Sequence, residues 1–125
     1  MVLIEEKTTD GIIGAAIEVH RTLGPGLLET VYEECLCHEL HLRGLPFRRQ
    51  LDLPIAYKAA TLKSGLRLDL IVADAVVVEV KAVESLLPIH EAQLMTYLRL
   101  SGKRVGLLIN FGTPVLRDGI VRRVL

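Results

Sequence analysis

The chain contains no tryptophan, and its aromatic residues are three tyrosines and two phenylalanines among 125 positions. A core without large rings must be built mainly from Leu, Val, Ile and Ala, which dominate the 50% of residues that are hydrophobic. This composition is typical of a globular protein and excludes a disordered chain. The length suits one domain, which we expect to span residues 1–125.

Cysteines and long apolar runs are also scarce. Cys35 and Cys37 are one residue apart and cannot form an ordinary disulfide, so nothing indicates a secreted, cross-linked scaffold. No stretch of about 18 uncharged apolar residues occurs, so no membrane-spanning helix and no membrane partner are expected. Acidic residues come early at the N-terminus, unlike a signal peptide. We therefore expect a soluble cytoplasmic protein.

The net charge is zero, but the charges are arranged in blocks. Residues 43–67 carry six bases and one acid, residues 97–125 carry the same numbers, and the two other blocks are acidic. Such blocks are usually solvated faces. They also suit a site in which carboxylates hold a metal and basic surroundings hold a polyanion.

Helical spacing of apolar residues predicts three helices. They cover Thr9–Leu23, about Leu28–Leu42 and about Pro88–Leu100. Gly24-Pro25-Gly26 separates the first two, and a proline is well placed in the first turn of the third.

Alternating apolar residues predict the strands. Three are expected over 51–57, 66–72 and 75–83, with turns near Lys63-Ser64-Gly65 and at Ala73-Asp74. Pro54 indicates an edge or a bulge in the first strand. The second strand should present one apolar face made of Leu66, Leu68, Leu70 and Val72.

The C-terminal quarter predicts a buried strand and a hairpin. The strand covers Val105–Phe111, and the hairpin joins Val115–Arg117 to Ile120–Val124 through Asp118-Gly119. The order of elements indicates an α/β fold in which helices pack on the faces of a mixed sheet.

Two acids and a lysine on neighbouring strands are the strongest indication of chemistry. If the strands pair around Asp74, Asp69 lies beside Glu79, and Lys81 projects from the same face as Glu79. Two carboxylates this close repel unless a proton or a cation lies between them. Mg²⁺ or Mn²⁺ suits oxygen ligands, and Lys81 could orient a water or neutralise a phosphate, as phosphodiester hydrolysis requires. Alternatively, Asp69 and Lys81 form an ordinary cross-strand ion pair.

Two further pairs of residues could belong to the same site. Glu29 follows Gly26 in the first turn of the second helix, where the helix dipole favours an anion, and Tyr32 comes three residues later. Gln93 and Tyr97 share one face of the third helix. The alternatives are that Glu29 only caps its helix, that Tyr32 is core, and that Gln93 and Tyr97 are a packing pair.

Together these residues resemble the small bacterial GxxExxY proteins, which are named for a motif matched here by Gly26-x-x-Glu29-x-x-Tyr32. The resemblance covers nearly the whole chain through the segments IIGAAIEVHRTLGPG (12–26), RLDL (67–70), VEVKA (78–82), HEAQL (90–94) with Tyr97, and LLINFG (107–112). That family is assigned to the PD-(D/E)XK nuclease-like superfamily. The resemblance therefore implies a restriction-endonuclease-like fold with the core order αβββαβ.

The resemblance also implies roles for individual residues. Asp69 corresponds to the first metal-binding acid of the superfamily, although Leu68 stands where a literal PD motif has proline. Glu79 and Lys81 correspond to the (D/E)xK pair. The further implied participants are the carbonyl of Val80 and Glu29 as metal ligands, and Gln93 and Tyr97 as a glutamine–tyrosine motif similar to that of RecB-type nucleases. We expect Gln93, Tyr97 and Arg67 to contact phosphate or to support the carboxylates.

The predicted function is metal-dependent hydrolysis of phosphodiester bonds in DNA, with RNA as the second choice and Mg²⁺ or Mn²⁺ as cofactor. No helix-turn-helix or zinc finger is present, so contacts should fall mostly on the nucleic-acid backbone. One alternative is a non-catalytic nucleic-acid-binding or assembly module that keeps the fold, with its C-terminal hairpin pairing across a homodimer. Another is hydrolysis of a small phosphorylated metabolite.

Overall fold

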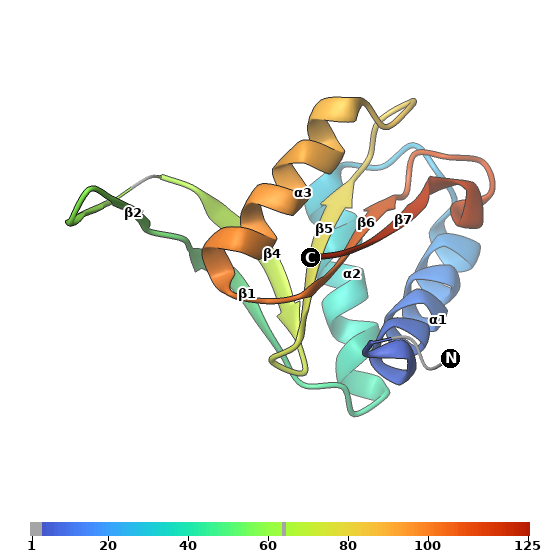
Figure 1. The fold of residues 1–125 in the computed structure, drawn as a ribbon. Helices are drawn as coiled ribbons and strands as arrows, with labels where there is room; N and C mark the ends of the chain where they lie inside the picture. Colours follow the sequence, from blue (N-terminus) through green and yellow to red (C-terminus); the bar gives the residue numbers. More distant parts are fainter. Residues whose placement is uncertain (1–3, 64) are drawn as a thin grey trace.

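The structure is a computed structural model, which describes residues 4–63 and 65–125. A five-stranded mixed sheet has α1 and α2 on one face and α3 on the other (Figure 1). The elements in chain order are α1 (Glu6–Leu23), α2 (Glu29–Leu42), β1 (Phe47–Asp52), β2 (Ile55–Tyr57), β3 (Ala60–Leu62), β4 (Arg67–Val72), β5 (Val76–Lys81), α3 (Pro88–Ser101), β6 (Val105–Asn110), the 3₁₀ turn η1 (Leu116–Gly119) and β7 (Ile120–Val124).

The main sheet has the strand order β1-β4-β5-β6-β7. Neighbours are antiparallel except β5 and β6, which are parallel. A parallel pair needs a long crossover connection, and α3 supplies it. Within the described residues, no helix is long and apolar enough to cross a membrane.

Each face of the sheet has its own hydrophobic cluster. Val78 and Leu107 pack towards α1 and α2, whereas Val77 and Leu108 pack towards α3. Successive strand residues therefore alternate between two covered faces, which explains why β5 and β6 are apolar except near their C-terminal ends, at Glu79, Lys81 and Asn110. Val76, Val78 and Val80 share the face towards α1 and α2, as alternation along the third predicted strand requires.

The predicted alternation of the second strand is wrong at one end. Leu70 and Val72 pack towards α1 and α2, but Leu66 and Leu68 pack towards α3. The regular β4–β5 ladder ends at Leu70 opposite Val78. On the other side, Gln50 of β1 interrupts the β1–β4 ladder with a φ of 52°. Because neither ladder is regular at Asp69, the alternation of side chains between the two faces of the sheet is interrupted there. The residues before and after Asp69 therefore follow different alternations.

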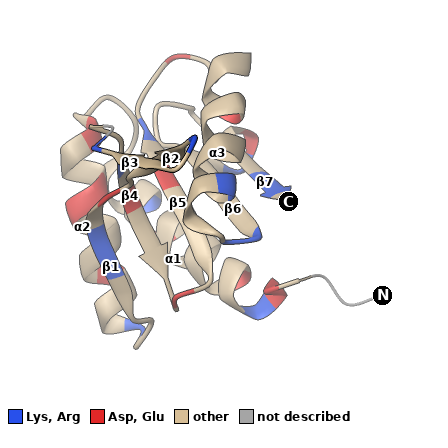
Figure 2. Cartoon of the chain, turned by 60° about the vertical axis from the view of Figure 1, so that its left-hand side comes forward, with Lys and Arg blue, Asp and Glu red and all other residues tan. Residues whose placement is uncertain are grey.

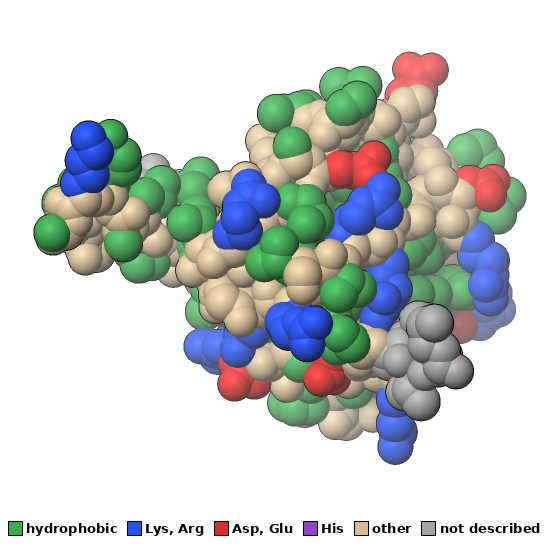
Figure 3. Space-filling view, in the orientation of Figure 1, with side chains coloured by type: hydrophobic (Ala, Val, Ile, Leu, Met, Phe, Trp, Pro, Cys, Tyr) green, Lys and Arg blue, Asp and Glu red, His purple; other side chains and the backbone are tan. Residues whose placement is uncertain are grey.

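The stretch predicted as one strand over 51–57 divides in two. Pro54 cannot donate to a ladder, and β1 ends two residues before it. β2 then pairs with β3 in a separate hairpin that projects from the body of the protein (Figures 1 and 3). The turn predicted at Ala73-Asp74 is confirmed, with φ of 53° and 51°. Ser64, in the other predicted turn, lies outside the described residues.

The predicted C-terminal hairpin is wrong. The segment 115–117 forms no strand, because Leu116 turns into the core as part of η1 and is buried there. β7 pairs instead with β6, antiparallel and in register from Val105–Val124 to Ile109–Ile120. The sheet gains its edge strand from this long-range pairing rather than from a local turn.

The buried side chain of Asn110 joins the ends of β5 and β6. Its Nδ2 donates to the Val83 carbonyl at 2.9 Å, and its Oδ1 accepts from the backbone N–H groups of Val83 and Gly112, both at 3.0 Å. The Phe111 N–H also donates to the Lys81 carbonyl, at 2.8 Å. These bonds hold the chain directly after Lys81.

Replacing Gly112 with alanine should destabilise this junction. A Cβ there would lie 2.2 Å from the Val83 carbonyl oxygen, and a main-chain contact cannot be relieved by a side-chain rotation. We expect Gly112→Ala to lower the free energy of unfolding in urea by about 1–3 kcal/mol. The control is Gly11→Ala inside α1, where the new methyl meets only the flexible Leu45 side chain and should be neutral or stabilising. Equal stability of the two variants would contradict this packing.

Candidate active site

Asp69 and Glu79 form an acid pair where β4 and β5 separate. Past the last regular pair of residues, side chains replace the missing main-chain bonds. Asp69 Oδ2 accepts a hydrogen bond from the Val80 N–H at 2.8 Å, and the Asp69 N–H donates to Glu79 Oε1 at 3.2 Å. The expectation that pairing around Asp74 brings the two acids together is confirmed.

Asp69 is partly and Glu79 almost fully shielded from water. Glu79 is 6% exposed, and burial, reinforced by the charge of Asp69, raises its pKa to about 9. Burial is also the main cause that raises the pKa of Asp69, and the charges of Glu33 and Glu29 act in the same direction. At neutral pH the pair therefore holds a proton, and a cation could take the place of that proton.

The end of β5 contributes two further groups. The charge of Lys81 acts against burial and favours ionised Glu79, as does the hydrogen bond from the Asp69 N–H, so the ammonium lies within electrostatic reach of the pair. The Val80 N–H points towards β4, where it meets Asp69. The N–H and C=O of one strand residue point to the same edge, so the Val80 carbonyl faces the same gap.

The start of α2 approaches the acid pair from the α1–α2 face. Glu29 is the first residue of α2 and is exposed. The preceding loop is held by the Tyr32 hydroxyl, which donates to the Gly24 carbonyl and accepts from the Leu27 N–H at 3.1 Å. The Tyr32 ring is fully buried and stacks on Phe111 with centroids 4.7 Å apart. The alternative that Tyr32 is core is confirmed, and its hydroxyl also orders the loop before Glu29.

The α3 face contributes Tyr97 and Gln93. Burial raises the pKa of Tyr97, and the charges of Glu79 and Asp69 raise it further, so this tyrosine lies near the acid pair. Gln93 is exposed and shares with Tyr97 a pocket of about 170 Å³ that Leu66 also lines. Their predicted shared face is confirmed. In Figure 2, acidic positions of β4 and β5 lie between α2 and α3.

Glu33 is a neighbour of the site that the sequence analysis missed. It is 5% exposed and accepts hydrogen bonds from Arg49 Nε at 2.7 Å and from Gln50 Nε2 at 2.8 Å. Glu33 comes one helical turn after Glu29, so the sequence indicates that the two acids lie on the same face of the helix. Its partners on β1 were not visible in the sequence, because they depend on how β1 packs against α2.

Other expected participants lie apart from the pair. Arg67 is exposed at the start of β4, where its Nε donates to Asp52 Oδ1 at 3.2 Å. Across residues 4–63 and 65–125, no three or more His, Cys, Asp or Glu side chains are grouped closely enough to hold a metal ion. Glu29 is therefore not gathered with Asp69 and Glu79 into such a group, and two acids form the centre of the site.

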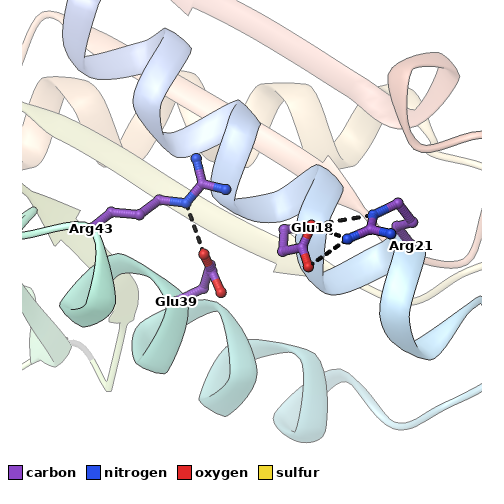
Figure 4. A network of polar contacts seen from close by, with 4 residues as sticks. All are labelled: Glu18, Arg21, Glu39 and Arg43. Carbon is purple, nitrogen blue, oxygen red and sulfur yellow. Dashed lines mark hydrogen bonds and ion pairs between the residues drawn. The ribbon is translucent and has the colours of Figure 1, made fainter.

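A pocket of about 380 Å³ between α1 and α2 is a weaker candidate. Two of the acids that line it, Glu18 and Glu39, already form ion pairs with Arg21 at 2.6 Å and with Arg43 at 2.8 Å (Figure 4). Paired surface carboxylates attract a further cation less than a buried, unpaired couple does. The acid pair of β4 and β5 is therefore the better site for chemistry.

The raised pKa of Glu79 predicts how stability changes with pH in the absence of metal. The folded chain keeps a proton that the unfolded chain releases near the ordinary value of 4.5, so the free energy of unfolding should fall as the pH rises from there to about 9. For one group the slope is at most about 1.4 kcal/mol per pH unit.

Glu79→Gln cannot ionise and should give a flatter profile in urea unfolding with EDTA. It should also be more stable than the unaltered protein at pH 8. Glu84→Gln, at an exposed acid, is the control and should follow the unaltered protein. Parallel profiles for Glu79→Gln and the unaltered protein would show that Glu79 is ionised when folded.

Comparison with known proteins identifies the family. The family model of the PD-(D/E)XK nuclease superfamily matches residues 6–124, which include all three helices and every strand. Neither the curated proteins nor the solved structures gave a match. The mixed sheet with helices on both faces is a restriction-endonuclease-like fold. The chain belongs to the PD-(D/E)XK nuclease superfamily.

Proposed function

We propose that the chain is a metal-dependent nuclease that hydrolyses phosphodiester bonds in DNA. The observation that carries the proposal is that Asp69 and Glu79 meet across the β4–β5 gap, with Glu79 buried and Lys81 within electrostatic reach, in a chain of a nuclease superfamily. The motif Gly26-x-x-Glu29-x-x-Tyr32 further supports a place among the GxxExxY proteins.

The donor atoms of the site suit Mg²⁺ or Mn²⁺. Two carboxylates that repel each other and share a proton can exchange that proton for a divalent cation, and all the available donors are oxygens. Asp69 and Glu79 would hold the ion with the Val80 carbonyl, and Glu29 would join through a water. When bound, the ion lowers the pKa of a water and polarises the phosphate.

The remaining roles fall to side chains around the pair. Lys81 would orient the attacking water and stabilise negative charge that develops on the phosphate. Gln93 and Tyr97 would donate hydrogen bonds to phosphate oxygens or align the carboxylates from α3. Arg67, at the outer end of β4, would contact the nucleic-acid backbone.

A second candidate function is a non-catalytic binding or assembly module, acting as a monomer or a homodimer. It is favoured by the bonds that Asp69 and Glu79 already make with main-chain N–H groups, because such bonds support the sheet without any ion. The next two experiments separate the candidates.

Mn²⁺ at millimolar concentration should raise the melting temperature of the protein. An ion that binds only the folded chain stabilises it by about 2.7 kcal/mol at one hundred times its Kd. Asp69→Asn and Glu79→Gln should lose this rise, while Asp74→Asn, at the exposed β4–β5 turn, should keep it. The absence of any rise in the unaltered protein would contradict the metal site.

Lys81→Met should abolish cleavage while the stabilisation by Mn²⁺ is retained. We expect the rate on a panel of labelled DNA and RNA to fall by a factor of about 10²–10⁴. Lys7→Met, at an exposed lysine of α1, is the control and should keep full activity. If the unaltered protein binds Mn²⁺ but cleaves neither nucleic acids nor a small phosphodiester, the non-catalytic module is the correct function.

A further inference from the structure

The β2–β3 hairpin projects from the body of the fold (Figure 1). Its turn is Lys58-Ala59, with φ of 45° and 67°, and five of its six strand residues are exposed. A two-stranded hairpin that buries so little is marginally stable in water. The hairpin therefore adds little to the stability of the fold.

The side chains of the hairpin are basic and apolar. Between Asp52 and Asp69 the sequence contains no acid but contains Lys58, Lys63 and Arg67. The Tyr57 ring is 59% exposed, with Lys58 Nζ at 5.4 Å from its centroid. On the face seen in Figure 3, the arm shows lysine and apolar side chains and no acidic ones. Positive charge beside an exposed aromatic ring matches a nucleic acid, which offers phosphates and flat bases.

The base of the hairpin adjoins the pocket of Gln93 and Tyr97. Lys63 and Leu66 line a pocket of about 350 Å³ together with Asp52, whose carboxylate is paired with Arg67, and Leu66 also lines the pocket of Gln93 and Tyr97. Asp69 is three residues after Leu66 along the chain, which corresponds to about 10 Å in an extended strand. A polymer that places one phosphate at the acid pair can therefore extend along this surface to the hairpin, whereas a small phosphoester cannot.

We propose that the β2–β3 hairpin is a nucleic-acid-binding arm. Lys58 and Lys63 contact phosphates, and Tyr57 lies against a base or sugar of the strand whose backbone passes the acid pair. The inference rests on the proposed function for the position of the cleaved phosphate, and it adds the reason why the site selects a polymer. Because phosphate contacts carry no sequence information, the arm contributes affinity rather than sequence preference.

Binding of the full chain to labelled single-stranded and duplex DNA, and to the matching RNAs, tests the arm. Fluorescence anisotropy in EDTA separates binding from cleavage. The double variant Lys58→Gln/Lys63→Gln should lose at least about tenfold in affinity at low salt. The slope of log K against log salt should become shallower by about 1.4–1.8, because two phosphate contacts are lost. Tyr57→Ser should weaken single-strand binding at least about fivefold.

The matched control is Lys7→Gln/Arg117→Gln, which removes the same charge from exposed residues of α1 and η1, away from the hairpin. Its affinity and salt slope should equal those of the unaltered protein. Melting curves confirm that each variant folds, since the substituted hairpin residues are exposed.

Three results would overturn the arm. The first is equal affinity of the hairpin variants and the control, which leaves the nuclease proposal intact if cleavage persists. The second is the absence of binding to all four nucleic acids. The third is a change of oligomeric state in Tyr57→Ser with unchanged nucleic-acid affinity, which would make the hairpin a contact between copies. Hairpin-dependent binding without cleavage in Mg²⁺ or Mn²⁺ would instead support the arm and refute the proposed catalysis.

Discussion

The half-buried carboxylate of Asp69 and the buried one of Glu79 each accept a hydrogen bond from the main chain across the β4–β5 gap, and these bonds determine the geometry of the candidate site. Where β4 and β5 separate, the Val80 and Asp69 N–H groups would lose their partners, and buried N–H groups without partners are costly. The side chains of Asp69 and Glu79 accept hydrogen bonds from these two N–H groups. The bonds that close the gap also hold the two acids next to each other, and burial together with this placement raises the pKa of Glu79. The same feature thus completes the sheet and prepares a site for a cation.

The residues that hold this arrangement lie behind it rather than on the surface. Asn110 makes three hydrogen bonds from a fully buried position, and the Tyr32 hydroxyl makes two that order the loop before α2. Buried bonds of this kind contribute about 1 kcal/mol each, whereas exposed ion pairs such as Glu18–Arg21 contribute little. Support for the site therefore comes from the core, which explains why Tyr32 is buried although its motif neighbour Glu29 is exposed.

Glu33 shows how the surroundings adjust the charge of the site. Its carboxylate is buried and raises the pKa of Asp69, and it forms an ion pair with the guanidinium of Arg49 at 2.7 Å. Removing one partner of a buried pair leaves an uncompensated charge, which is more costly than losing an exposed pair. Arg49 therefore ties β1 to α2 and limits the negative charge near Asp69. The hairpin that begins just after β1 extends the same side of the sheet outwards.

Local patterns in the sequence were sufficient to predict the three helices, the strands β4, β5 and β6, and the meeting of Asp69 with Glu79. Apolar periodicity reports which side of an element is buried, and a two-residue turn at Ala73-Asp74 fixes the register of the strands around it. Only the tertiary structure decided the change of pleat at Asp69, the pairing of β7 with β6, the partners of Glu33 and the projection of the hairpin. Each of these depends on contacts between distant segments or on an interrupted ladder. Neither kind of feature produces a periodic pattern of apolar residues in the sequence.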